Sequence, residues 1–296
     1  MTSPLAVGER IDVCHVPFTF RGRSGELHLE RCSGRDQVVR QIEATGWRSY
    51  EAPLPIALCE LVARQPSAFL DVGANSGFYS LIAALCGCRE IRAFEPVPSI
   101  SGLLARNIEH TLGPGVQPIR VFHEAISDHN GTADLYMPDQ GHGLIETSAS
   151  LNRAFREEHS DQFRVKVSSL DQHFQNNPLQ KSLQLVLKID VESCEEQVLR
   201  GAEATIAERR PSILVEILPG ASLDFYNDFI ARHDYVHYPL LHYINRLVAT
   251  ASIEPSVHLR DHLLIPKERI PPALLDSARA RMYGQLIWLG KQLTGR

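Results

Sequence analysis

The sequence predicts an α/β protein built on a doubly wound, mostly parallel sheet that ends in an antiparallel hairpin at its C-terminal edge. Three observations carry this prediction. From residue 68 onward, short apolar runs alternate with helical patterns. The stretch Gly73-Ala74-Asn75-Ser76-Gly77 stands where the first strand gives way to a helix. The last two apolar runs follow one another with no helical pattern between them, as the strands of an antiparallel pair do.

The alternation places the elements in order. Strands are expected at 68–72, 91–94, 119–126, 184–190 and 212–218, and helices at 78–86, 98–112, 194–208 and 222–232. Two β-like runs, 235–244 and 262–265, supply the edge hairpin. Between the third and fourth strands the pattern breaks, because 131–137 and 163–170 read as strands of an arm and 141–150 as a polar loop. We therefore expect an insertion over about 129–170 that lies above the ligand-binding edge of the sheet.

The outer segments divide the chain further. Residues 1–49 are predicted to form an N-terminal extension with short β-like pieces, 50–268 the α/β domain, and 269–296 a helical tail. The segment 56–62 predicts a helix that leads into the core. Apolar residues in 283–293 make the tail a candidate surface for a homo-oligomer.

Composition excludes several classes. The net charge of −5 and a pI of about 6.2 give no basic field for nucleic acid or an anionic membrane. No run of about 18 apolar residues predicts a transmembrane helix, and no N-terminal window has the pattern of a signal peptide. The six cysteines lack a disulfide-framework spacing. We therefore expect free thiols and a cytoplasmic protein.

The glycine-rich turn is the first candidate ligand site. Gly73 and Gly77 permit a tight turn and a close approach, and the following helix directs unpaired N–H groups at the ligand. Asn75 stands where a dinucleotide loop has a further glycine, which disfavours a pyrophosphate and favours a nucleoside with an amino-acid tail. Asp71 would hold the ammonium of that tail directly or through water. The alternative is a helix cap and a packing turn.

Acids at the ends of the next two strands extend the site. Glu95 directly follows the strand 91–94, and its carboxylate is placed to accept hydrogen bonds from two ribose hydroxyls. Glu124, Ala125 and Asp128 follow the next strand, where a turn in this topology flanks an adenine ring. A solvated strand end and a structural turn are the alternatives.

A second polar group ends the fourth strand. A period of two puts Lys188, Asp190 and Glu192 on one side, a costly arrangement if buried and unpaired, which indicates a polar site. Glu216 lies inside an apolar run and needs a partner such as Lys188, a metal or a ligand. A buried Lys188–Glu216 pair is the alternative to a catalytic role.

Several of these runs together resemble the FkbM-type methyltransferases. They are Tyr50-Glu51, Phe69–Ser80, Ala93-Phe94-Glu95-Pro96, Ala125-Ile126-Ser127, Lys188–Glu192, Val198–Ala202, Arg210–Glu216 and Asp261–Pro266. The resemblance covers about residues 50–266. It implies a Rossmann-like class I methyltransferase, S-adenosylmethionine as methyl donor and an alcohol oxygen as acceptor. The sequence departs at Ser193, where the family usually has Gly, and a serine is tolerated there if its φ is negative.

The acceptor's proton must then be removed. The candidates are His142 in the loop 141–143, Asp190, and a magnesium ion held by Asp190, Glu216 and Glu192 that would lower the hydroxyl's pKa. We expect a sugar, glycan or natural-product hydroxyl as acceptor and no nucleic acid partner. The competing hypotheses are a nicotinamide-dependent oxidoreductase and a non-catalytic nucleotide-binding or interaction protein of the same fold.

Overall fold

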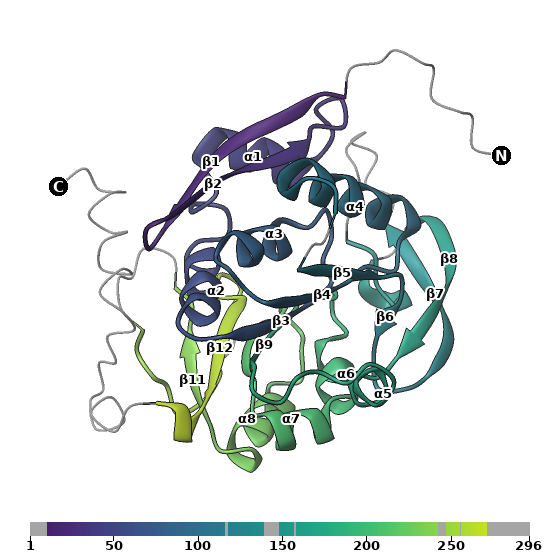
Figure 1. Ribbon diagram of the computed structural model, residues 1–296. Coiled ribbons are helices and arrows are strands. Elements are labelled where there is room, and N and C mark those ends of the chain that lie inside the picture. Colours follow the sequence, from purple (N-terminus) through teal and green to yellow (C-terminus); the bar gives the residue numbers. More distant parts are fainter. Residues whose placement is uncertain are drawn as a thin grey trace.

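The computed structural model describes residues 11–115, 118–138, 148–156, 158–241, 247–254 and 256–270. A central seven-stranded sheet runs in the order β11-β12-β10-β9-β3-β4-β5 (Figure 1). Its strands are β3 (Ser67–Val72), β4 (Glu90–Phe94), β5 (Ile119–Phe122), β9 (Gln184–Ile189), β10 (Ser212–Glu216), β11 (Tyr235–Pro239) and β12 (Asp261–Pro266). β12 lies between β10 and β11 and is antiparallel to both, whereas the other pairs are parallel. The predicted sheet and its antiparallel C-terminal edge are confirmed.

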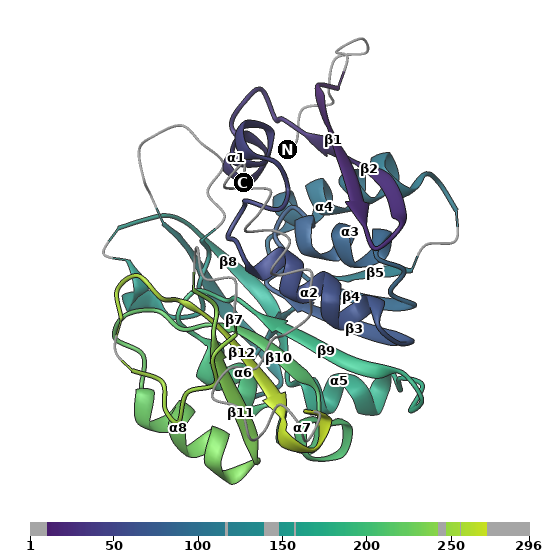
Figure 2. The ribbon, with the colours of Figure 1, turned by 90° about the vertical axis from the view of Figure 1, so that its left-hand side faces the viewer.

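Helices cover both faces of this sheet (Figures 1 and 2). One layer holds α2 (Leu54–Ala63), α3 (Phe78–Leu85) and α4 (Pro98–Leu112), and the other holds α5 (Leu170–Asn176), α6 (Glu195–Arg200), α7 (Glu203–Arg209) and α8 (Leu223–Arg232). Each layer packs apolar side chains on the sheet to form its own hydrophobic core. The strands between them are buried on both faces, as their continuous apolar sequences require.

Two predicted elements are wrong in extent. The strand expected at 119–126 is divided, because β5 ends at Phe122 and β6 (Ala125–Ile126) joins a separate sheet with β8 (His159–Ser168) and β7 (Gly131–Pro138). The helix expected at 194–208 is broken between α6 and α7 at Gly201. A Cβ on Gly201 would lie 2.0 Å from the Ser127 carbonyl oxygen, so only glycine fits at this break.

The N-terminal segment packs on the α/β core. β1 (Val13–Phe20) and β2 (Arg23–Glu30) form an antiparallel hairpin, which α1 (Gln37–Thr45) follows. The hairpin lies over α3 and α4 (Figure 2). Phe18, Leu27 and Leu29 are fully buried in the same hydrophobic cluster as α2 and α3. Residues 11–49 are therefore joined to the core by burial, and the boundaries of the predicted domains stay a prediction.

Other sequence expectations have simple outcomes. The six cysteines are free thiols. Within the ranges that the structure covers, no helix is long and apolar enough to cross a membrane. The predicted helical tail at 269–296 lies outside the described residues from 271 onward.

Candidate functional site

A cavity of about 390 Å³ opens at the carboxyl ends of the parallel strands. This is the edge at which open α/β sheets bind ligands. Its walls come from the loop after β3, the ends of β4, β9 and β10, the small sheet and α1. The sequence-predicted residues that line it are Gly73, Asn75, Glu95, Glu124, Ala125, Lys188, Asp190, Glu192 and Glu216.

The loop after β3 is fixed to the neighbouring strands by its backbone. Gly73 and Ala74 donate N–H groups to the Phe94 carbonyl oxygen at 3.1 and 2.9 Å. Gly73 has a φ of +83°, and a Cβ there would lie 1.8 Å from the Asp190 carbonyl oxygen. Only glycine fits this close approach, which brings the ends of β3 and β9 together beside the cavity.

Glu95 ties that loop to the end of β4. Its Oε2 accepts the Asn75 N–H at 3.0 Å, and its Oε1 accepts the Val97 N–H at 2.9 Å. Burial raises the pKa of Glu95 to about 7, although both backbone donors act in the opposite direction. Each oxygen keeps a second lone pair for a ligand donor. The carboxylate therefore organises the loop and also faces the cavity.

Asp71 and Gly77 lie behind the loop and do not line the cavity. Asp71 is fully buried and accepts a hydrogen bond from Ser80 Oγ at 2.7 Å. Burial raises its pKa to about 6, which the charge of Lys188 partly offsets. Gly77 has a φ of +97° and caps α3, where a Cβ would lie 2.3 Å from Leu104 Cδ1. The predicted contact of Asp71 with a ligand, directly or through water, and the predicted role of Gly77 in cofactor binding stay predictions.

The carboxylate of Glu124 has partners within the protein. It accepts from Ser168 Oγ at 2.8 Å, from Lys166 Nζ at 2.5 Å and lies 3.3 Å from His173 Nδ1. Burial alone would raise its pKa, but these three partners lower it to about 2. Glu124 thus joins the small sheet to α5, while Ala125 beside it offers backbone and a small side chain to the cavity.

Lys188 is a buried cation at the end of β9. Its Nζ donates to Asp190 Oδ2 at 2.8 Å and lies 4.6 Å from the centre of the Tyr79 ring. Burial would lower the pKa of Lys188, but Asp190, Asp71 and Glu51 outweigh it and raise the pKa. Lys188 therefore stays charged and pairs with Asp190, and the alternative of a Lys188–Glu216 pair is not formed.

Two acids that the sequence reasoning did not select complete this cluster. Glu51 Oε2 accepts a hydrogen bond from the Tyr79 hydroxyl at 2.5 Å, and burial and the charge of Asp190 raise the pKa of Glu51. Asp261 on β12 stands opposite Glu216 in the antiparallel register, and burial raises its pKa to about 7. Glu51 belongs to the Tyr50-Glu51 run that resembles the FkbM family, but nothing in its local sequence predicts its position beside Lys188.

Glu216 ends β10, Glu192 follows β9, and both line the cavity. Burial, together with the charges of Asp190 and Glu192, raises the pKa of Glu216 to about 10. Burial also raises the pKa of Glu192 to about 7. Across the part of the chain that the structure describes, the donor atoms of Asp190, Glu192 and Glu216 do not gather within 4.8 Å of one another. The geometry therefore gives the predicted magnesium site no support.

The turn after β9 has an unusual backbone. Glu192 and Ser193 have φ values of +55° and +78°. Glu195 Oε1 accepts the N–H groups of Val191 and Ser193 at 3.0 and 3.2 Å, and Asn152 Nδ2 donates to Ser193 Oγ at 3.0 Å. The condition that Ser193 has a negative φ is wrong, and hydrogen bonds hold the left-handed turn instead. His142 lies outside the described residues.

The family model described as "Methyltransferase FkbM domain" matches residues 71–237, which are more than half of the chain. The chain belongs to the FkbM methyltransferase family. The match begins at Asp71 and contains the glycine-rich loop, Glu95 and the ends of β9 and β10. Glu51 and Asp261, which adjoin Lys188 and Glu216, lie outside the matched range. No curated protein matches the chain.

Several solved structures are similar to parts of this FkbM-family chain. They include methyltransferase FkbM from Methylobacillus flagellatus KT, with 15% identity, a TM-score of 0.44 and coverage of 67% of this chain and 43% of that one. A SAM-dependent methyltransferase from Agrobacterium tumefaciens has 12% identity and a TM-score of 0.42, with 89% and 72% covered. Magnesium protoporphyrin IX methyltransferase from Synechocystis PCC 6803, solved with bound SAM, has 9% identity and a TM-score of 0.41, with 77% and 82% covered. Because these TM-scores lie below 0.5, no conclusion about this chain rests on the likenesses.

Proposed function

We propose that this chain is an S-adenosylmethionine-dependent O-methyltransferase that methylates a hydroxyl of a sugar, glycan or natural product. The observation that carries the proposal is the cavity itself, which Gly73, Asn75 and Glu95 line together with the acids at the ends of β9 and β10. When bound, S-adenosylmethionine supplies a methyl group made electrophilic by a positively charged sulfur. The protein must then hold that cation, orient the acceptor and take up a proton.

The charge of the wall supports a cationic ligand. Glu51, Asp190 and Glu192 line the cavity together with Lys188, Arg156 and Arg260. Glu216 also lines it but is protonated at neutral pH and adds no charge. A sulfonium and an ammonium group are attracted to such a wall, whereas the pyrophosphate of a nicotinamide cofactor is repelled. The same charge also disfavours the phosphates of a nucleic acid. This argument weighs against the oxidoreductase alternative.

Asp190 is the base that we favour. Lys188 Nζ holds its Oδ2 at 2.8 Å, which fixes the carboxylate and leaves Oδ1 to accept a hydroxyl proton. The side chain is 30% exposed, so an acceptor in the cavity can reach it. Glu216 lies at the end of the adjacent strand, and its raised pKa keeps it protonated at neutral pH, so it can donate a hydrogen bond but is not the base. His142 and a magnesium ion remain the alternative means of removing the proton.

The acceptor's chemistry is proposed from the outer wall. Gln37 and Gln41 of α1, together with Arg156 and Arg260, bring amide and guanidinium groups to the cavity. Such groups bind hydroxyls through several hydrogen bonds, as a sugar or polyol needs. This wall supports a polyhydroxylated acceptor.

Calorimetric titration tests the donor. We expect S-adenosylhomocysteine to bind the wild-type protein and NADH to give no measurable heat of binding. Glu95→Gln should weaken binding about 10- to 100-fold, because it removes a charge-assisted hydrogen bond to the ligand. The matched control is Glu90→Gln, which removes a carboxylate from the opposite end of β4, where Glu90 pairs with Arg92 and Arg120. The proposal would be overturned if NADH bound to the protein and S-adenosylhomocysteine did not.

Turnover assays then separate the remaining hypotheses. A labelled-methyl screen of sugars, glycans and small alcohols should find an acceptor, and Asp190→Asn should abolish its methylation while leaving the donor bound. Ligand binding with no transfer to any acceptor would favour the non-catalytic hypothesis. Turnover that survives EDTA would eliminate the magnesium scheme.

A further inference from the structure

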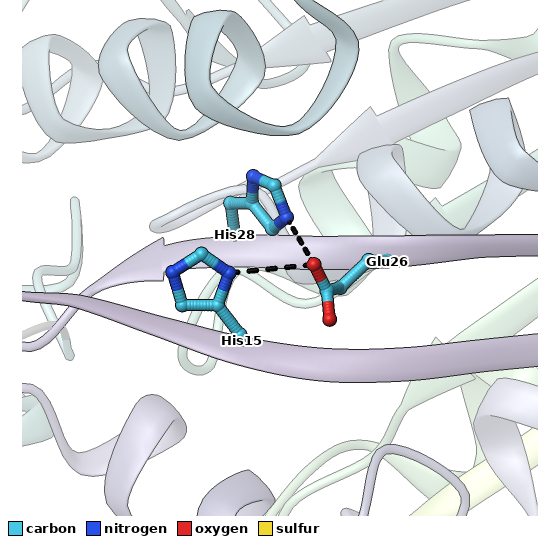
Figure 3. Close-up of side chains that lie close together, drawn as sticks. All are labelled: His15, Glu26 and His28. Carbon is cyan, nitrogen blue, oxygen red and sulfur yellow. Dashed lines mark hydrogen bonds and ion pairs between the residues drawn. The ribbon is translucent and has the colours of Figure 1, made fainter.

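A second polar cluster lies on the N-terminal hairpin, away from the cavity. His15 on β1 stands directly opposite His28 on β2, and Glu26 is two residues before His28. Figure 3 shows both imidazoles directed at one oxygen of Glu26. Glu26 Oε2 lies 2.7 Å from His28 Nε2 and 3.3 Å from His15 Nδ1. Of the residues that the structure describes, only these three bring potential metal-ligand atoms within 4.8 Å of one another.

Neighbouring groups fix the orientation of His28. Its Nδ1 lies 2.9 Å from the His110 carbonyl oxygen in the last turn of α4, and Thr111 Oγ1 bonds both the N–H and the carbonyl of His28 at 3.0 and 3.1 Å. A carbonyl oxygen only accepts, so Nδ1 carries a hydrogen. In neutral imidazole, Nε2 then has a lone pair that faces the Glu26 carboxylate. Two acceptors at 2.7 Å need a cation between them, either a proton or a metal ion.

We propose that His15, Glu26 and His28 form a binding site for a divalent transition-metal ion of the zinc class. Two imidazoles and one carboxylate are a ligand set that zinc takes in proteins, with water in the fourth position. With metal–ligand bonds of about 2.0–2.1 Å, two ligands of a tetrahedral ion lie roughly 3.3 Å apart. The 3.3 Å separation of Glu26 and His15 matches this spacing, and the 2.7 Å separation needs only a small outward movement of an exposed side chain.

The surroundings of the cluster agree with a three-ligand site. The His28–His110 hydrogen bond is the kind of outer contact that orients a metal-binding imidazole. The side chains of His15 and Glu26 are 57% and 45% exposed, so water can reach the fourth position. None of the three residues lines the cavity. A metal ion here would therefore act on structure and not on methyl transfer.

The expected effect is a clamp across the hairpin. The ion would join β1 to β2 near the point where His28 is anchored to α4. The hairpin leads through the chain into α1, which brings Gln37, Val38 and Gln41 to the cavity. Metal binding is thus expected to raise the stability of the N-terminal segment, since an ion that binds only the folded state stabilises it.

Zinc titration of the full chain tests the site. After EDTA treatment and removal of the chelator, calorimetry with ZnCl₂ at pH 7.5 should show one ion per chain, and zinc should raise Tm. His15→Gln and His28→Gln should each weaken zinc binding at least about 10- to 100-fold and remove the rise in Tm. MgCl₂ should not reproduce the effect, because imidazole ligands do not suit magnesium.

The matched control is His129→Gln, which removes an exposed histidine that pairs with Asp128 outside the hairpin. This variant should keep wild-type zinc affinity and the full rise in Tm. Zinc binding that His15→Gln and His129→Gln reduce equally would overturn the proposal. So would the absence of zinc binding at pH 7.5, which would mean that Glu26 pairs only with protonated imidazoles.

Discussion

The buried cation Lys188 should be required for stability, and its replacement by methionine isolates the charge. Lys188 is 3% exposed, and its Nζ lies 2.8 Å from Asp190 Oδ2 and 4.6 Å from the Tyr79 ring centre. Methionine keeps the length of the side chain and an apolar contact with the ring. The variant therefore loses the charge opposite Asp71, Asp190 and Glu51, and little packing.

The expected loss is about 3 kcal/mol at neutral pH, the lower part of the range for removing one partner of a buried ion pair. It should depend on pH. The raised pKa of Lys188 means that its contribution is complete below the unfolded value of about 10.4. In the variant, the pKa of Asp71, already about 6, and that of Glu51 should rise further above their unfolded values. Since such groups destabilise the fold as pH rises, the loss should be small near pH 4.5 and complete by about pH 8.

Urea unfolding, followed by intrinsic fluorescence from pH 4.5 to 8.5, measures this difference. The matched control is Lys267→Met, whose exposed ion pair with Asp234 should be worth about 0.2–1 kcal/mol at every pH. A Lys188→Met loss below about 1 kcal/mol at pH 8, or one that is constant with pH, would refute the electrostatic account of this cluster.

Three further outcomes are expected. S-adenosylmethionine should bind more tightly at pH 8 than at pH 6, because the pKa values of Glu95 and Glu192 lie near 7 and a cation favours their ionised forms; a flat calorimetric profile would contradict this. Gly73→Ala should destabilise the protein more than Gly220→Ala, since both glycines have positive φ but only Gly73 meets the Asp190 carbonyl; equal unfolding midpoints would argue against a tight loop. Ser193→Gly should stabilise the protein by up to about 1 kcal/mol through relief of the left-handed conformation, less the bond from Asn152; thermal unfolding measures the difference, and a lower Tm would show that the hydrogen bond dominates.

Much of the fold follows from local pattern. The helix expected at 98–112 coincides with α4, since Pro98 can begin a helix and Gly113 ends it with a φ of +78°. The strands of the parallel sheet are continuous apolar runs and are found within a few residues. The division of 119–126 between two sheets was not predictable, because a change of pairing partner at Glu124 leaves the apolar pattern unchanged.

The site was predictable only where residues end strands. Gly73, Glu95 and Asp190 could be found, because the carboxyl ends of parallel strands meet at one edge. Glu51 and Asp261 could not, since they approach Lys188 and Glu216 through tertiary packing and an antiparallel register that local sequence does not encode. For the same reason, the sequence did not predict that Lys188 pairs with Asp190 and not with Glu216.

The turn at Ser193 shows how sequence and structure constrain the site together. The departure from the family's usual glycine is visible in the sequence, but the sign of φ is not, and the structure shows a left-handed serine beside a left-handed Glu192. The buried Glu195 carboxylate accepts two N–H groups of this turn, which leaves the backbone little freedom to relax. The turn directs Glu192 to the cavity and follows directly on the Asp190 carbonyl that packs against Gly73. The strained backbone at this position therefore lies where the ends of β3 and β9 meet the proposed ligand. Strain of this kind is found where the surrounding structure holds a binding site rigid.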